Sequence, residues 1–420
     1  MNQTMNSAKP SLITDTASLA AFCGRLKGAD FITVDTEFMR ETTYWAKLCL
    51  VQVAGPDEAY CIDPLAPDMD LKPLYELFAD RSLLKVFHAG RQDLEIFFNA
   101  MGGEVPAPVF DTQIAAMVCG FGDQVGYEAL VAKLAGANLD KSQRFTDWAQ
   151  RPLTERQVIY ALGDVTHLRK VYVALKQRLE KSGRASWLDE EDAVLTSADT
   201  YKVDPREMWR RLRARTRAPR MLAVLRELAA WREITAQSFD VPRQRVAKDD
   251  AILELAASMP VTVEDIKRSR LAKPLASGKF VEGVLAAVAK GKAVPDGECP
   301  RLEREEGWDS QVPRAVTELL KLLLKARSEA HDVAQRLIAT SDEVEAIALS
   351  DTADVPALHG WRRWRAPAAE ERKTQSASAS RSILRQILLR SRPAWRSWRR
   401  QHPAPPLPGR SGCPCWRPAS

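Results

Sequence analysis

The sequence lacks the features that mark membrane-spanning and secreted proteins. No run of about 18 apolar residues occurs in its 420 residues, so we expect no transmembrane helix. The opening segment, MNQTMNSAKP, has no apolar stretch, which argues against a secretion signal. Cysteine is scarce, at seven residues, and its spacing fits neither a disulfide framework nor a zinc site. We therefore expect a cytoplasmic protein.

Acidic residues are almost absent from residues 362–420, which contain two of them against 14 Lys and Arg. The rest of the chain carries 53 acidic and 47 basic residues, so the net charge of +6 comes entirely from this tail. We interpret the Arg-, Pro- and Trp-rich tail as a disordered or frame-shifted segment, with a basic RNA-binding extension as the alternative. The basic net charge is therefore no evidence that the folded domains bind nucleic acid.

Two carboxylates follow a predicted buried strand near the start of the chain. Residues 31–34 are apolar or β-branched, which favours a strand, and Asp35 and Glu37 come directly after them. Because strand side chains alternate with period 2, both acids are predicted to point to one side at the strand's end. A cation would relieve their mutual repulsion. The alternative is a surface strand end with two solvated acids.

The pattern around these acids predicts an α/β domain with a mixed sheet of about five strands. Strands are predicted over 48–53 and 59–63, paired as a hairpin by the turn at 55–58, and over 83–87. Helices are predicted over 11–28, 71–78, 126–135 and 154–181. Antiparallel strands followed by strand–helix units are typical of a mixed sheet.

Further candidate residues lie on two predicted helices. Asp93 is in the first turn of the helix after residue 87, where the helix dipole alone would favour an acid. Tyr160 and Asp164 are four residues apart and therefore share one helix face. An ordinary polar face would explain that pair equally well.

Three segments, in this order, resemble the three motifs of the DEDD exonuclease superfamily, in its tyrosine-bearing branch. They are D-T-E at 35–37, H-A-G-R-Q-D-L-E at 88–95 and Y-x-x-x-D at 160–164. The resemblance covers about residues 10–185 and implies a ribonuclease H-like fold and 3′→5′ exonuclease activity. It also implies two divalent cations, Mg²⁺ or Mn²⁺, bound by four carboxylates. Asp35 would bridge both cations, Glu37 and Asp164 would hold the one beside the attacking water, and Asp93 would act on the other.

The resemblance gives Tyr160 the role of orienting or helping to deprotonate the attacking water. Phe38 is a candidate for stacking on a terminal base, with a core aromatic as the alternative. Gln52 and His88 are candidate contacts to phosphate or to water, with satisfied buried polar residues as the alternative.

Residues 221–291 have a helical pattern that resembles an HRDC domain, particularly in W-R-E and D-x-P-R-x-x-V-x-K-D. Arg243, Arg245 and Lys248 are candidate phosphate contacts by charge and position. The basic run at 210–217 is either a solvated hinge or a phosphate-contacting strip.

The predicted domains are an exonuclease domain (1–185), a linker (186–212), an all-α HRDC domain (213–294), a second HRDC-like helical module (295–361) and the tail (362–420). This layout resembles the ribonuclease D family, which implies a monomeric exoribonuclease that releases nucleoside 5′-monophosphates and matures the 3′ ends of tRNA precursors, with no membrane partner. A DNA 3′→5′ exonuclease is the alternative; the absence of a helicase motor or polymerase favours RNA. A catalytically dead RNA-binding protein would have lost a carboxylate, and all four are present.

Overall fold

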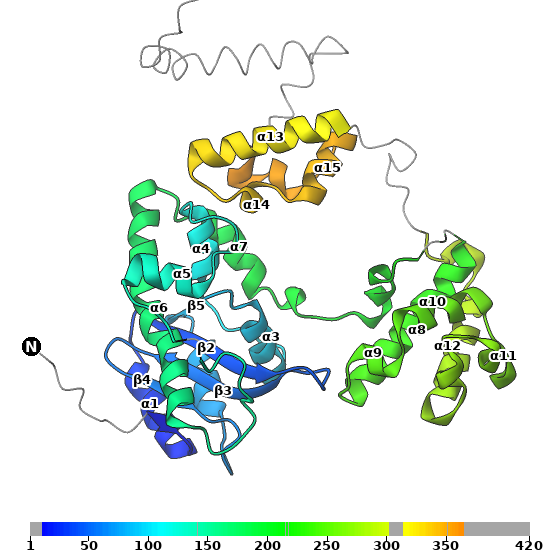
Figure 1. Ribbon diagram of the computed structural model, residues 1–420, viewed down its shortest axis with the longest axis horizontal. Helices are drawn as coiled ribbons and strands as arrows, with labels where there is room; N and C mark the ends of the chain where they lie inside the picture. The colour runs from blue at the N-terminus through cyan, green and yellow to red at the C-terminus, as the bar shows by residue number, and fades with distance from the viewer. Residues whose placement is uncertain are drawn as a thin grey trace, which may run out of the picture.

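The computed structural model describes residues 11–140, 142–214, 216, 218–301, 314–350 and 352–364. It contains a mixed β-sheet with helices on both faces, a separate group of helices, and a short helical module that returns to the first domain (Figure 1). The predicted tail lies outside the described residues, apart from its first three. Within the described part of the chain, no helix combines the length and the apolar character that crossing a membrane requires.

The sheet has six strands in the order β1-β4-β3-β2-β5-β6. Their bounds are β1 Leu12–Ile13, β2 Phe31–Met39, β3 Lys47–Ala54, β4 Ala59–Ile62, β5 Leu84–Phe87 and β6 Val109–Asp111. β2, β3 and β4 are antiparallel neighbours, whereas β1–β4, β2–β5 and β5–β6 are parallel pairs. The mixed sheet and the β3–β4 hairpin were predicted. The sheet has six strands where about five were expected. The ranges predicted correspond to β2 to β5, whereas β1 and β6 have only two and three residues and carry too little pattern to be recognised.

Seven α-helices and one π-helical turn of the described residues surround the sheet. Their bounds are α1 Thr16–Leu26, α2 Lys72–Ala79, α3 Arg91–Ala100, α4 Thr112–Val118, α5 Tyr127–Leu130, α6 Glu155–Ser182 and α7 Trp187–Thr196, with a π-helical turn at Val131–Ala135. The single helix expected over 126–135 is therefore α5 followed by this turn. α6 begins with a capping box in which the Thr154 hydroxyl accepts from the Gln157 N–H, and it ends at Gly183 in the left-handed conformation.

Successive side chains of β2 point to alternate faces of the sheet. Ile32 and Val34 pack with α1, α2 and α3 in one apolar cluster. On the other face, the Thr33 hydroxyl donates to the Val165 carbonyl of α6 at 2.8 Å. Asp35 and Glu37 follow Thr33 with period 2 and therefore lie on the α6 side. The strand continues to Met39, so the expectation that the two acids stand at its end is wrong; they lie inside the strand, with a register irregularity between Glu37 and Phe38.

A second group of helices follows a connecting segment that includes α7 and a 3-10 helix at Pro205–Arg211. It consists of α8 Pro219–Ser238, α9 Arg243–Val246, α10 Asp249–Ser258, α11 Val263–Arg268 and α12 Val281–Ala293. α8, α10, α11 and α12 share an apolar core with Met208, Trp209 and Leu212 of the 3-10 helix and its end. The connection is thus packed against the helices that follow it.

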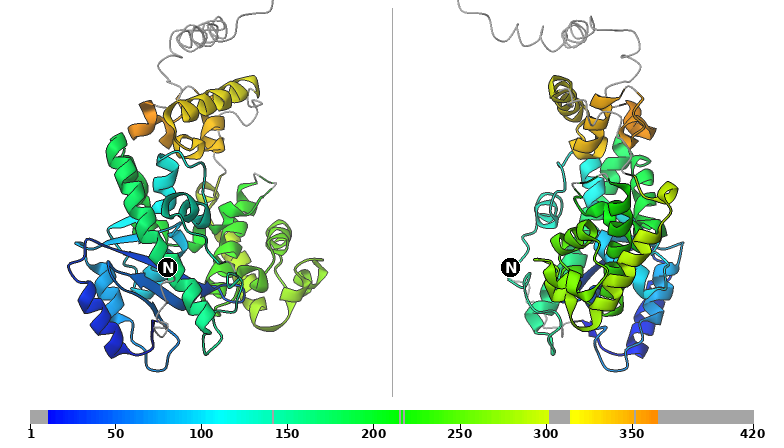
Figure 2. Two further views of the ribbon diagram at one scale, coloured as in Figure 1. Left: turned by 60° about the vertical axis from the view of Figure 1, so that its left-hand side comes forward. Right: turned by 90° about the vertical axis from the view of Figure 1, so that its right-hand side faces the viewer.

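A third group of helices consists of α13 Arg314–His331, α14 Gln335–Ile338 and α15 Ser341–Leu349, followed by 3-10 helices at Pro356–Leu358 and Gly360–Trp364. They lie over α4, α6 and α7, as the views in Figures 1 and 2 agree. Leu324, Leu337 and Ile347 belong to the same apolar cluster as Ala116 of α4 and Leu168 of α6. The Ala334 N–H donates to the Met117 carbonyl at 2.9 Å. The module therefore completes the core of the first domain.

Candidate active site

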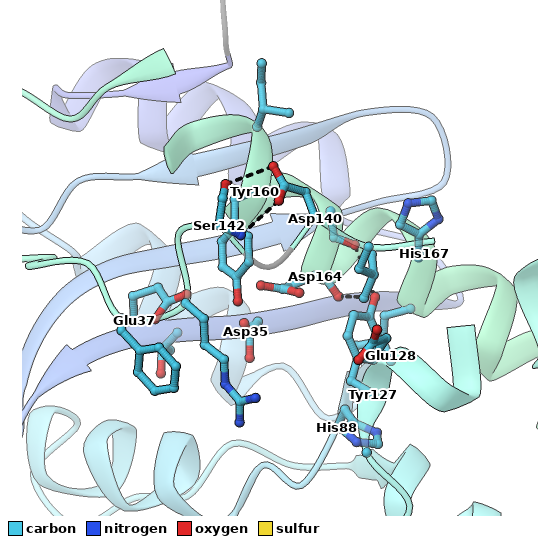
Figure 3. A pocket seen from close by; sticks show the side chains of 18 of the residues that line it. Asp35, Glu37, His88, Tyr127, Glu128, Asp140, Ser142, Tyr160, Asp164 and His167 are labelled. Atoms are coloured by element: carbon cyan, nitrogen blue, oxygen red, sulfur yellow. Dashed lines mark hydrogen bonds between the residues drawn. The ribbon is translucent and has the colours of Figure 1, made fainter. Parts of the chain in front are cut away.

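A cavity of about 1150 Å³ opens on the α6 side of β2. Asp35, Glu37 and Asp164 lie on its wall, together with Tyr160 and His88 (Figure 3). The cavity is therefore formed by the strand, by one face of α6, by the start of α3 and the residues before it, by the start of α5, and by the loop before α6. All three sequence motifs contribute to this region, although Asp93 itself is not among the residues that line the cavity.

Three carboxylates meet at the cavity wall. Asp35, Glu37 and Asp164 each present an oxygen atom within 4.8 Å of the other two. Two come from alternate positions of one strand, and the third comes from a helix that crosses the same face of the sheet. This convergence is the arrangement that divalent cations with oxygen ligands require.

Burial and mutual repulsion raise the pKa values of these acids. Removal from water raises the pKa of Glu37 to about 8, with further contributions from the charges of Asp164 and Asp93. Burial raises the pKa of Asp164 to about 7. The pKa of Asp35 is also well above its ordinary value, because of burial first and its three acidic neighbours second. Without a cation these acids therefore favour the protonated form, and a bound cation would favour their ionised form.

Asp93 is held apart from the three clustered acids. It is buried on α3, and its carboxylate accepts a hydrogen bond from the Thr36 hydroxyl. Burial raises the pKa of Asp93 to about 6, and the Thr36 hydrogen bond opposes that rise. Since Asp93 also raises the pKa values of Asp35 and Glu37, it lies close enough to share their electrostatic environment.

Tyr160 and Asp164 project from one face of α6, as their spacing predicted. The Tyr160 hydroxyl points toward the carboxylates in Figure 3, and its ring lies 6.1 Å from the Trp148 ring, between centroids. Burial and the charges of Asp164, Glu37 and Asp35 raise the pKa of Tyr160. Behind Asp164, the Tyr127 hydroxyl donates to the Asp164 carbonyl at 2.6 Å and fixes the helix backbone.

The other candidate contacts of the first domain have different surroundings. Phe38 and His88 line the cavity. His88 Nδ1 lies 3.0 Å from the Thr112 hydroxyl, and burial lowers the pKa of the ring. Gln52 does not line the cavity; it is fully buried and pairs with Asp35 across β2 and β3. Both polar atoms of its side chain lack a hydrogen-bond partner within the described residues.

The three candidates on the helical domain lie away from this cavity. Arg243 forms an ion pair with Glu233 and donates to the Tyr44 hydroxyl at 3.0 Å, so it ties the helical domain to the β2–β3 loop. Arg245 and Lys248 are exposed. The cavity also contains cationic and polar residues that were not candidates: Gln92, which lies within the second motif, and Arg144, Arg156 and His167, which lie outside the three motifs.

The chemistry of the clustered acids fits a divalent metal. Their ligand atoms are hard carboxylate oxygens, which Mg²⁺ and Mn²⁺ prefer. Among the described residues, no ion pair joins an Arg or Lys to any of the four acids, Asp35, Glu37, Asp93 and Asp164. A cation would therefore supply the positive charge that the surrounding side chains do not.

Two family models match the chain. One, described as 3′-5′ exonuclease, matches residues 10–180, and the other, the HRDC domain, matches residues 221–288. Ribonuclease D of Granulibacter bethesdensis is 49% identical over 355 residues, which are 84% of this chain and 90% of that protein. Ribonuclease D of Jannaschia sp. is 52% identical over 358 residues, which are 84% and 92% of the two chains.

Solved structures agree with these matches. Escherichia coli RNase D, described as an exoribonuclease involved in structured RNA processing, superimposes with a TM-score of 0.72 at 31% identity, covering 85% of this chain and 96% of that one. The catalytic core of RRP6 from Trypanosoma brucei has a TM-score of 0.51 at 21% identity over 69% of this chain and 81% of that one, which shows a shared fold.

Proposed function

Because this chain belongs to the ribonuclease D family and is a 3′-5′ exoribonuclease, we propose that it matures the 3′ ends of tRNA precursors. It would release nucleoside 5′-monophosphates one at a time, as a monomer in the cytoplasm. The observation that carries the proposal is the convergence of Asp35, Glu37 and Asp164 within 4.8 Å at a cavity of about 1150 Å³. That space admits the terminal nucleotides of a single strand.

Asp35, Glu37, Asp164 and Asp93 would hold two divalent cations, Mg²⁺ or Mn²⁺. When bound, such cations neutralise charge on the phosphodiester and lower the pKa of a coordinated water. The three clustered acids would supply ligand oxygens directly, which their mutual approach within 4.8 Å supports. Asp93 lies on α3, where the Thr36 hydroxyl orients its carboxylate. From this position it would contribute to binding the second cation. The raised pKa values of the acids support this assignment, since repulsion among them favours a bound cation.

Tyr160 would orient the attacking water rather than remove its proton. The raised pKa of its phenol keeps the hydroxyl protonated at neutral pH, so it can donate one hydrogen bond and accept another. Attack of the water at phosphorus breaks the bond to the 3′ oxygen of the preceding nucleotide. The shortened strand then keeps a 3′ hydroxyl, and the departing nucleotide carries the phosphate.

The cavity wall offers contacts for the strand itself. Phe38 and the exposed Phe145 present aromatic surface on which a base can stack. Arg144 and Arg156 place positive charge near the acids and would attract the phosphates of the strand. These residues would guide the 3′ end and leave the chemistry to the four carboxylates and Tyr160.

Digestion of matched substrates tests the proposal. A 3′-extended tRNA and a DNA strand with the same 3′ sequence are incubated with the full chain and Mg²⁺ or Mn²⁺. We expect mononucleotides from the RNA, progressive shortening to the mature end, and no products in EDTA. Faster digestion of the DNA would favour the DNA exonuclease alternative. Products in EDTA would contradict the role of the metal.

A further inference from the structure

A second cavity, of about 420 Å³, lies between the first domain and the helical domain. Four arginines line it, Arg40, Arg211, Arg232 and Arg243, and we call it the arginine cavity. They come from the β2–β3 loop, the 3-10 helix, α8 and α9. Asp249 is the one acid among the lining residues. So many guanidinium groups around one open space produce a local positive potential.

Three of the four arginines are held in place by acids, of which Glu95 and Glu233 lie outside the cavity lining and Asp249 belongs to it. Arg40 donates to both oxygens of Glu95 at 2.7 and 3.1 Å. Arg243 is paired in the same way with the buried Glu233. Arg232 donates to Asp249 at 2.6 Å and to the Ala247 carbonyl at 3.1 Å. Each guanidinium has five N–H donors, so these bonds fix its orientation without using all of its donors.

One cation of the cavity has no acidic partner among the described residues. Arg211 is exposed at the cavity and forms no ion pair with any of them. An interface held together only by its ion pairs would not require this additional arginine. The charge of Arg211 is therefore available to an anion that enters the cavity.

The arginine cavity and the catalytic cavity are joined by β2. Glu37 and Phe38 line the catalytic cavity, and Arg40, just past the end of the strand, lines the arginine cavity. Three residues of extended chain span about 10 Å. Stacked nucleotides follow one another at about 3.4 Å along a strand, so about three of them cover that distance.

We propose that the arginine cavity binds a backbone phosphate of the same RNA strand whose 3′ end lies at the carboxylates. This inference rests on the exoribonuclease function proposed above. The cavity would hold the strand a few nucleotides from the scissile bond, and its contacts are to phosphate, so they are independent of sequence. The two domains would thereby bind one substrate together.

Arg211→Ala tests the proposal, because Arg211 is exposed and has no ion pair with a described residue, so we expect its loss to leave the interface intact. The matched control is Arg270→Ala, an exposed arginine of the helical domain outside the cavity. Binding of a fluorescent ten-nucleotide RNA is measured in EDTA, where no hydrolysis occurs. We expect Arg211→Ala to weaken binding about three- to tenfold and to reduce the slope of log K against log salt by about 0.7. Arg211→Lys should retain most of the affinity.

Hydrolysis separates this inference from the proposed function. The ratio of kcat/KM for the ten-nucleotide RNA to kcat/KM for a dinucleotide, which is too short to reach both cavities, should fall in Arg211→Ala and stay at the wild-type value in Arg270→Ala. Equal effects of the two substitutions would overturn the proposal. If 5′-CMP alone showed the same loss of affinity in Arg211→Ala as the RNA does, the cavity would be a site for free phosphate and the strand proposal would be wrong. A failure of dinucleotide hydrolysis in the wild type would instead refute the catalytic assignment.

Discussion

The hydroxyl of Thr36 donates a hydrogen bond to the carboxylate of Asp93, across 57 residues of sequence. Thr36 lies between Asp35 and Glu37 in β2, and its side chain points to the opposite face of the sheet. The strand therefore carries the two acids of the first motif and also orients Asp93 of the second motif. Thr36→Val keeps the shape of the side chain and removes the donor. We expect activity or metal affinity to fall about ten- to hundredfold, as for other groups that orient metal ligands. Titration of activity against Mg²⁺ measures this effect, and Thr36→Ser should restore most of it.

Asp164→Asn should abolish hydrolysis and stabilise the metal-free protein. The substitution removes a proposed ligand and one of three repelling charges without changing the volume of the side chain. We expect activity to fall by more than about a hundredfold, while the melting temperature in EDTA at pH 8 rises by a few degrees. Calorimetry and mononucleotide release test the two effects on the same sample. A lower melting temperature would indicate that Asp164 stabilises the fold rather than a cation.

Metal affinity should increase as the pH rises from about 6 to about 8. The pKa of Asp164 is raised to about 7 and that of Glu37 to about 8, so in this range the metal-free folded state binds more protons than the unfolded state. Stability without metal therefore falls with rising pH, because the slope of the unfolding free energy follows the difference in bound protons. A cation competes with the same protons. Calorimetric titration with Mg²⁺ at pH 6, 7 and 8 should show tighter binding at each step; a flat profile would contradict the raised pKa values.

Tyr160→Phe should lower kcat about ten- to hundredfold and leave KM nearly unchanged. The phenol is proposed to orient water, and the pH profile of kcat should therefore keep its shape, since no group that titrates near neutrality is lost. Tyr75→Phe on α2, outside the cavity, is the matched control. A change in the pH profile would mean that Tyr160 takes part in proton transfer.

Tyr44→Phe should loosen the contact between the two domains. The Tyr44 hydroxyl is buried and shares hydrogen bonds with Glu233, Arg243 and Gln237. Its removal leaves Glu233 without one of its two partners, which we expect to destabilise the protein by about 1–3 kcal/mol. Denaturant unfolding measures the loss, and activity on a dinucleotide should fall less than activity on a long RNA.

The sequence was most informative where chemistry and element type coincide. The D-x-E spacing on a strand and the Y-x-x-x-D spacing on a helix each place two side chains on one face, and the structure brings the two faces together. Arg144 and His167 share the cavity but lie in no pattern, because a loop or one turn of helix brings them there only after folding. The ion pair of Arg243 with Glu233 could not be predicted from the sequence either, because the acid lies on a different helix and meets the arginine only after folding. Gln52 was a candidate contact, and its burial opposite Asp35 is a consequence of strand register.

The position of α13–α15 has a consequence for synthesis on the ribosome. These helices cover α4 and α6 and share one apolar core with them, although they follow the whole HRDC-like domain in the chain. At 5–20 residues per second, the ribosome needs roughly 10 to 30 s after finishing α6 to produce the residues that cover this surface. During that interval the nascent exonuclease domain exposes part of its core, and a chaperone that holds apolar surfaces has its longest opportunity to bind there. The apolar surface of the exonuclease domain is thus fully covered only after α13–α15 have been translated.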